Sequence, residues 1–371
     1  MTSVAHAQTS SVLLRGGYAP AQCEIQSISL DGILLTPINP NETAGTQAEQ
    51  VLMPLSDCVD VTGSNAAAFG ELATTATTFW RARTRLSRGD VTLAEPLFDS
   101  LATQYADRTS ESAVIVFSGK LESKLRQGEL NEATDAWLQL VDITARQAER
   151  TDEPAYTAFT LTPWTLQIDD ELHLCPLLPP VWFDSPSLQG WSARPGPDVT
   201  SSTAITLQQM YQAGASAESG FEGATLPSLT PNDPPGVRLV HNIIASRIGT
   251  ASERDVARDA LRKELDSNPP DWLRAWCQIA VGRSLVKEDN VDSRWQGVVE
   301  LLRLPAEMPH LNPYLTGLAL AEAAVVSAEL GDVDGATRLR TELLSSYPEH
   351  PVTHWLPIRN WNPAQTRASV P

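Results

Sequence analysis

Two stretches, LSRGDVTLA at residues 86–94 and LRQGELNEA at residues 125–133, decide the fold of this chain. Both follow one pattern, in which a glycine is followed directly by an acidic residue and, five positions later, by an alanine. A third copy, GDVDGA, occupies residues 331–336. The residues of the repeated turn are Gly89, Asp90, Ala94, Gly128, Glu129, Ala133, Gly331, Asp332 and Ala336.

Each position of the pattern has a physical role at the junction of two helices. Glycine ends a helix readily, because it adopts a left-handed conformation without a side-chain clash. The acidic residue can cap the next helix and lies at its positive end. The small alanine lets two helices approach closely. Apolar residues recur at helical spacing on both sides, as with Phe79, Ala82 and Leu86 before the first turn, which predicts amphipathic helix pairs.

This arrangement resembles the tetratricopeptide repeat (TPR) family, in which helical hairpins of about 34 residues stack in a row. The third copy also ends on Tyr347-Pro348, as repeats of that family do. Nine positions after its glycine, however, it has Arg340 where the family has a large apolar residue. The resemblance implies a mainly α fold, an α-α hairpin solenoid, whose function is a non-enzymatic scaffold for a protein partner. No cofactor is implied.

Five segments are expected along the chain. Residues 25–35 alternate in polarity around Asp31-Gly32, a turn typical of β-hairpins, and the short module there resembles Sm-like or SH3-like β-modules. We expect a leader at 1–20, this β-module at 21–63, two TPR-like helix pairs at 64–149, a proline- and tryptophan-rich irregular insertion at 150–235, and three further TPR-like pairs with a C-terminal cap at 236–371.

The insertion combines many prolines, which prevent long helices, with four large aromatic residues. Those aromatics are Trp164, Trp182, Phe183 and Trp191. One interpretation is a surface loop that grips a partner or ligand, since long ordered loops often carry function. The other is that the aromatics anchor the insertion to the helices, since tryptophan is usually buried for its area.

Composition limits the classes of partner. The formal net charge of -18 argues against nucleic acid, whose phosphates require a basic surface. No run of 18 apolar residues predicts a membrane span. Ala5-His6-Ala7 has the form of a signal-peptidase site, but the charged and apolar regions that should precede it are missing. Export and a cytoplasmic location are both left open.

Four cysteines are present, and two of them, Cys23 and Cys58, bracket the β-module. A disulfide between them is one interpretation if the protein is exported. The alternative is two buried thiols, because free cysteine behaves as a small apolar residue. The sequence contains no Cys-x-x-Cys pair, so no structural metal site is predicted.

No catalytic motif is found, whether a nucleophile elbow, a phosphate-binding loop or a metalloprotease helix. His350 and His354 are four residues apart, but we interpret them as surface or packing residues. Two alternatives to the scaffold remain. One is a ligand-binding protein or hydrolase with a pocket between the insertion and the helices. The other is a structural subunit of a cell-envelope or homo-oligomeric assembly.

Overall fold

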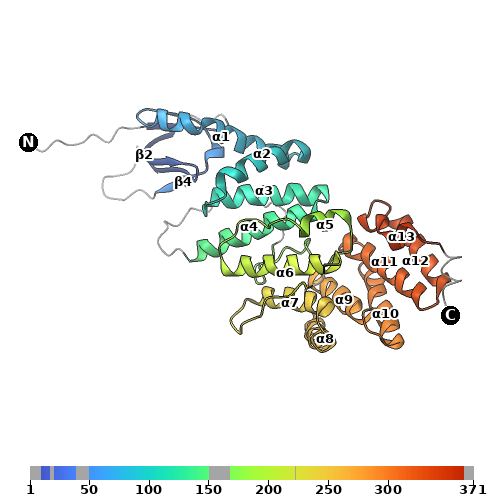
Figure 1. Ribbon diagram of the computed structural model, residues 1–371. Helices are drawn as coiled ribbons and strands as arrows, with labels where there is room; N and C mark the ends of the chain where they lie inside the picture. The colour runs from blue at the N-terminus through green and yellow to red at the C-terminus, as the bar shows by residue number, and fades with distance from the viewer. Residues whose placement is uncertain (1–9, 17–20, 39–49, 150–167, 222, 363–371) are drawn as a thin grey trace, which may run out of the picture. The chain divides into compact units, whose positions relative to one another are not determined.

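A computed structural model describes residues 10–16, 21–38, 50–149, 168–221 and 223–362 (Figure 1). The fold is mainly α, with helices that pack in consecutive order and a small N-terminal antiparallel sheet. Its contacts divide the chain into two compact units. Unit 1 comprises residues 1–166 and 197–201, and unit 2 comprises residues 167–196 and 202–371. Among the described residues, no helix has the length and apolar character needed to cross a membrane.

Unit 1 begins with a five-stranded antiparallel sheet of order β4-β3-β2-β1-β5. Strands β2 and β3 form the expected hairpin, in which Ser29 pairs with Gly32. Gly32 is required there, because its φ is 144° and a Cβ would lie 2.4 Å from the carbonyl oxygen of Met53. The strands are β1 (Ser10–Leu14), β2 (Ala21–Ser29), β3 (Gly32–Pro37), β4 (Val51–Met53) and β5 (Cys58–Thr62), with the 3-10 turn η1 (Leu55–Asp57) before β5.

Strand β1 lies within the stretch that the sequence assigned to a loose leader. It pairs with both β2 and β5, so the β-module begins at Ser10 rather than near residue 21. The stretch Ser10–Leu14 is too short to show a clear alternation by itself. The structure places Val12 in the core of the sheet, and this burial explains why so short a segment is ordered.

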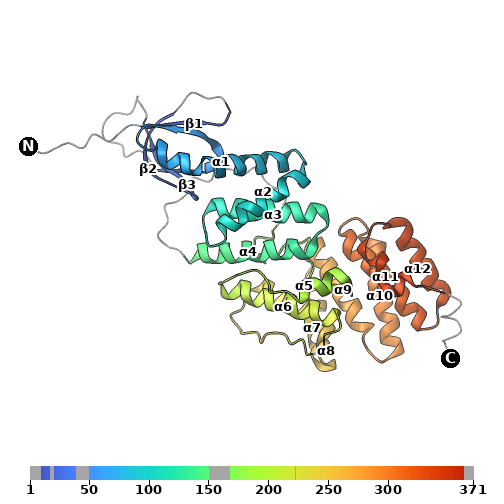
Figure 2. The ribbon, with the colours of Figure 1, turned by 45° about the horizontal axis from the view of Figure 1, so that its top comes forward.

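Four helices follow in unit 1: α1 (Ala66–Ser87), α2 (Val91–Tyr105), α3 (Glu111–Gln127) and α4 (Leu130–Ala148). Helix α1 packs against the sheet, whose core includes its residues Phe69 and Ala76 (Figures 1 and 2). The Tyr105 hydroxyl donates to the Leu30 carbonyl at 2.7 Å, and Arg108 pairs with Asp31 at 2.8 Å. The sheet and helices α1 to α4 therefore lie in one compact unit.

The three repeated turns have the same backbone hydrogen bonds. Gly89, Gly128 and Gly331 have φ values of 84°, 76° and 93°. In each copy the glycine N–H donates to the carbonyl three residues earlier, and the N–H of the following acid donates to the carbonyl five residues earlier. This is the Schellman arrangement. The alanines of the motif, Ala94, Ala133 and Ala336, are fully buried. Of the three acids, Asp332 also caps its helix through its side chain.

Unit 2 contains α5 to α13 and the 3-10 turn η2. Neighbouring helices from α6 to α12 pack against each other, and α7, α9 and α11 also contact one another in that order. The elements are α5 (Pro186–Ser192), α6 (Ser202–Glu218), α7 (Pro235–Ile248), α8 (Ala251–Asp266), α9 (Asp271–Leu285), α10 (Val291–Glu307), α11 (Pro313–Glu329), α12 (Val333–Ser346), η2 (Pro351–His354) and α13 (Leu356–Arg359).

Three elements of unit 2 differ from expectation. Helix α6 (Ser202–Glu218) lies inside the segment 150–235 that was expected to be irregular, because no proline interrupts the chain there. Helix α10 continues to Glu307 rather than ending before Pro305. Pro305 lies in the last turn, so it removes a single hydrogen bond and leaves most of the helix intact. The proline-rich insertion contains the short helix α5, in which Pro186 occupies the first turn and Ser185 caps the N-terminus, positions that suit both residues.

Candidate functional site

The most unusual feature of unit 2 is an irregular segment, residues 174–183, which we call the strap. It has no helix or strand, yet almost all of it is buried. Leu174 and Cys175 are 0% and 1% exposed, whereas Leu177 is 49% exposed. A segment without regular structure that runs through a core must satisfy its backbone groups by other means.

Buried side chains of three helices supply hydrogen bonds to the strap's carbonyl groups. They come from α6, α9 and α11, and each donates to a different carbonyl. The four bonds are Trp276 Nε1 to Pro176 at 3.2 Å, the Tyr211 hydroxyl to Leu178 at 2.8 Å, the Tyr314 hydroxyl to Val181 at 2.9 Å, and Arg283 Nη2 to Trp182 at 2.7 Å.

Prolines reduce the number of donors that the strap must satisfy. Pro176, Pro179 and Pro180 have no N–H group. The N–H groups of Leu178 and Val181 donate within the strap, to Cys175 and Pro179. The strap therefore offers carbonyl acceptors mainly, and the helices around it offer donors. This complementarity explains how the sequence keeps an irregular segment inside a helical layer.

Trp182 is the main side-chain anchor of the strap. Its ring meets the Tyr211 ring edge to face, with centroids 5.4 Å apart. It also lies over Gly214 of α6, where a Cβ would come within 2.5 Å of the ring. Glycine at position 214 is therefore needed for the ring to approach the helix. The neighbouring Phe183 meets Trp355 edge to face at 6.5 Å.

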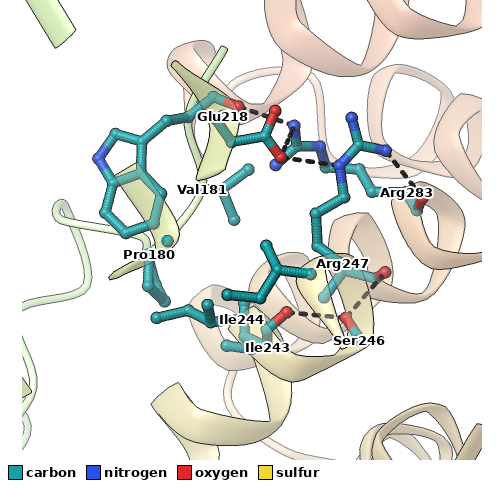
Figure 3. A pocket seen from close by; sticks show the side chains of 12 residues that line it. Pro180, Val181, Glu218, Ile243, Ile244, Ser246, Arg247 and Arg283 are labelled. Atoms are coloured by element: carbon teal, nitrogen blue, oxygen red, sulfur yellow. Dashed lines mark hydrogen bonds and ion pairs between the residues drawn. The ribbon is translucent and has the colours of Figure 1, made fainter. Parts of the chain in front are cut away.

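A buried ion network lies beside the strap, with one charged residue from each of α6, α7, α9 and α11. Figure 3 shows the Glu218 carboxylate facing the guanidinium groups of Arg247 and Arg283, at 2.7 and 3.2 Å. Arg283 also contacts Glu322 at 2.7 Å. The second oxygen of Glu322, Oε2, is buried without a hydrogen-bond partner in the described structure.

The network sets the charge states of its members. Burial by itself would raise the pKa of Glu218, but the charges of Arg247 and Arg283 outweigh it and lower that pKa to about 2. Burial would lower the pKa of Arg283, but Glu218 and Glu322 raise it above its ordinary value. Glu218 and Arg283 therefore stay charged near neutral pH. Neither is poised to exchange a proton there, so this pair suits positioning rather than acid–base catalysis.

The space between the strap and the helices is too small for a ligand. The cavity lined by Pro180, Trp182, Glu218 and Arg283 has a volume of about 10 Å³, roughly the room that one water requires. A pocket for a small molecule usually has several hundred Å³. At the strap, the insertion and the helices therefore leave no room for a ligand.

A second, open groove of about 500 Å³ lies where residues 224–228 pass α7 and α8. Its lining combines Leu226 and Val256 with the polar residues His241, Asn242 and Glu253. Burial lowers the pKa of His241, and its Nδ1 is buried without a described hydrogen-bond partner. This groove has the size of a ligand site, and one of its lining residues carries a buried polar atom without a described partner.

The aromatic residues singled out in the sequence occupy the core. Trp182, Phe183 and Trp191 are between 6% and 8% exposed, so they anchor the insertion and do not form an exposed binding surface. Trp164 lies outside the described residues. His350 is also a packing residue, because it stacks on Tyr314 and its Nε2 lies 2.9 Å from the Tyr314 carbonyl oxygen. Within the described ranges, no cluster of three or more candidate ligands for a metal is found.

Cys23 and Cys58 are free, buried thiols in the structure, which is the alternative to the disulfide. They lie on β2 and β5, the two neighbours of β1. Burial raises the pKa of Cys23, and it raises that of Cys58 to about 11. Neither thiol is therefore activated as a nucleophile, because the reactive form is the thiolate.

The strap and its donors were missed by sequence reasoning, although one signal was present. Arg283 ends a largely apolar stretch at 275–282, and Glu322 interrupts an apolar stretch at 318–326. A charge on an apolar face demands a buried partner. No protein-family model, curated protein or solved structure matches the chain, so these residues are interpreted from their own geometry alone.

Proposed function

We propose that this chain is a protein–protein interaction scaffold built on TPR-like helical hairpins. The observation that carries the proposal is the strap. The helices of unit 2 already hold an irregular polypeptide segment through hydrogen bonds to its backbone. A layer of helices that binds one polypeptide segment in this way is suited to binding polypeptide.

The architecture supports the same proposal. Stacked hairpins bury their apolar faces against neighbouring hairpins and present extended surfaces. Identical glycine turns end α1, α3 and α11, and the contacts among α7, α9 and α11 are those of first helices in successive hairpins. We infer five hairpins in a solenoid, with α13 and η2 as a C-terminal cap. We also propose that the N-terminal sheet is an Sm-like or SH3-like module.

The test is capture of partners from native cells, followed by reconstitution with the purified partner. Deleting residues 150–235 would remove the strap and α6, so point variants are needed. Val256 in the open groove and Val299 on α10 are 69% and 56% exposed. They offer a matched pair, Val256→Asp and Val299→Asp. A purified partner that binds the wild-type chain with a measurable Kd supports the scaffold. A Kd weakened by only one of the two substitutions locates the surface.

Failure to reconstitute any captured protein would remove the support for a scaffold. One observation then favours a second function, small-molecule binding in the open groove. His241, whose Nδ1 is buried without a described hydrogen-bond partner, belongs to a lining of mixed polarity around a groove of suitable size. Thermal stabilisation of the wild-type chain by a compound, lost in His241→Ala and retained in the control Val299→Asp, would establish that function.

A further inference from the structure

We propose that the groove formed by α6, α9 and α11 is a receptor for proline-rich segments without regular structure, and that the strap is its ligand in cis. A partner segment of the same chemistry would exchange with the strap. This inference deepens the proposed scaffold function and rests on it. It names the surface of the scaffold and the class of partner that the surface fits.

The recognition is directed at the backbone, which allows exchange. All four donors belong to the helices, and all four acceptors are strap carbonyls. Another segment can present carbonyls in the same places, provided that few of its N–H groups are buried without acceptors. Proline meets that condition. Recognition of proline-rich segments by aromatic-lined grooves is an established mode of binding.

Trp182 is the strap side chain whose site has the most specific shape. The Trp182 ring contacts Tyr211 and lies over the bare backbone of Gly214. A residue with a Cβ at position 214 would close this space. We therefore expect the partner segment to carry an aromatic residue two positions after a proline, as Trp182 follows Pro180 in the strap.

The receptor does not depend on the strap for its own packing. Helices α6 and α7, α7 and α9, and α9 and α11 contact one another directly. The ion pairs of Glu218, Arg247, Arg283 and Glu322 join these helices to one another. Within this network, Arg283 alone bonds to the strap. When the strap leaves, most of the contacts that hold the helices together remain.

The chain contains its own reporters of strap release. Cys175 lies in the strap and Cys277 in α9, and they are 1% and 0% exposed. Release of the strap exposes Cys175 while Cys277 stays covered. Global unfolding exposes both. Alkylation of the native chain by iodoacetamide, with each site followed by mass spectrometry, separates the two events.

The experiment titrates the full chain with a fluorescent peptide spanning residues 172–185 and carrying Cys175→Ser. Three chains are compared: wild type, Trp182→Ala, which weakens the strap and leaves the receptor intact, and Leu177→Ala, a control at an exposed strap position. Weakening a ligand in cis raises the fraction of open receptor and tightens apparent binding by the same factor. We expect the Trp182→Ala chain to bind the peptide about tenfold more tightly than the other two.

Bound peptide should also speed alkylation of Cys175 without affecting Cys277, because it displaces the strap. A peptide of the same sequence carrying Trp182→Ala should neither displace the strap nor compete with the fluorescent peptide for the receptor. The proposal is overturned if a folded Trp182→Ala chain does not bind the peptide, or if binding leaves Cys175 protected. Should that chain lose its helical circular dichroism, Tyr211→Phe and Tyr314→Phe replace it. Each removes one donor and should speed alkylation of Cys175 alone, about threefold to tenfold. Equal acceleration at Cys277 would show that the strap is inseparable from the core.

Failure here is distinguishable from failure of the scaffold. If a purified partner binds but the peptide does not, the scaffold stands and the partner binds another surface. If the peptide binds and displaces the strap while no captured protein can be reconstituted, the receptor stands without the proposed cellular role.

Discussion

Replacing Arg283 with methionine should destabilise the protein more than any surface substitution. Arg283 contacts Glu322 at 2.7 Å and Glu218 at 3.2 Å, and it donates to the Trp182 carbonyl. Without it, Glu322 keeps only a contact of 3.9 Å with Arg247. Removing one partner of a buried ion pair typically costs about 3–5 kcal/mol, and we expect a loss in this range at pH 7.

The effect should depend on pH in a defined direction. The pKa of Glu218 is lowered from the ordinary value of 4.5 to about 2. This carboxylate therefore contributes stability above about pH 4.5, and that contribution is lost as the pH falls toward 2. The shift corresponds to roughly 3 kcal/mol. In the Arg283→Met chain, Glu218 keeps Arg247 but loses Arg283, one of the two charges that lower its pKa. That pKa then lies closer to its ordinary value, so this chain loses less stability on acidification. The difference between the two chains should therefore shrink from pH 7 to pH 3.

Urea unfolding at several pH values, followed by tryptophan fluorescence, measures both effects. Arg303→Met is the matched control, because the Arg303 side chain is 52% exposed and pairs with Glu300 within one helix. It should change the free energy of unfolding by less than about 0.5 kcal/mol. A loss below about 1 kcal/mol for Arg283→Met, or a difference that stays constant with pH, would refute this account of the network.

Three other predictions concern the turns, the helix contacts and the thiols. Gly128→Ala should lower the free energy of unfolding in urea by about 1 kcal/mol, because φ is 76° there although an added Cβ would meet no neighbouring atom. Gly70 is the control, since it lies within α1 and an added Cβ would also meet no atom there. Gly70→Ala should be neutral or stabilising. Gly119→Ala should lower Tm and reduce the free energy of unfolding by roughly 1–3 kcal/mol, because the added Cβ would lie 2.2 Å from the Phe98 ring. An unchanged Tm would contradict the close packing of α2 and α3. Cys23 and Cys58 should remain unmodified by Ellman's reagent at pH 8 in the native chain, since burial protects both thiols and raises their pKa values. Rapid reaction of either thiol would contradict their burial in the core of the sheet.

The helices could be predicted closely because their ends carry local signals. Thr250 and Glu253 form a capping box at the start of α8, and Asn312-Pro313 begins α11 as cap and first residue. The glycine turns ended α1, α3 and α11 within a residue or two. Each of these signals depends on neighbours in the chain, so the sequence alone is sufficient to read them.

The strap could not be predicted, because its recognition uses groups that every residue has. Every residue has a backbone carbonyl group, so the sequence does not indicate which carbonyls accept hydrogen bonds. The donors also lie on helices far from the strap in the chain. Strand β1 illustrates the same limit, since its order depends on pairing with β2 and β5. The aromatic residues near the prolines, by contrast, were evident in the sequence. Whether they are exposed or buried could not be decided, because both cases give the same sequence pattern.

The strap also determines how unit 2 loses its structure. In stacked repeats each repeat is usually stabilised by contacts with its nearest neighbours alone, so the stack can unfold from one end. Here a single segment bonds to Tyr211, Trp276, Arg283 and Tyr314, which lie 33, 100, 101 and 133 residues from their acceptors. While the strap is docked, α6, α9 and α11 melt together in one cooperative transition. During synthesis its last donor arrives only when α11 has been made. Docking of the strap is therefore complete only after the distant C-terminal half of the unit has been made.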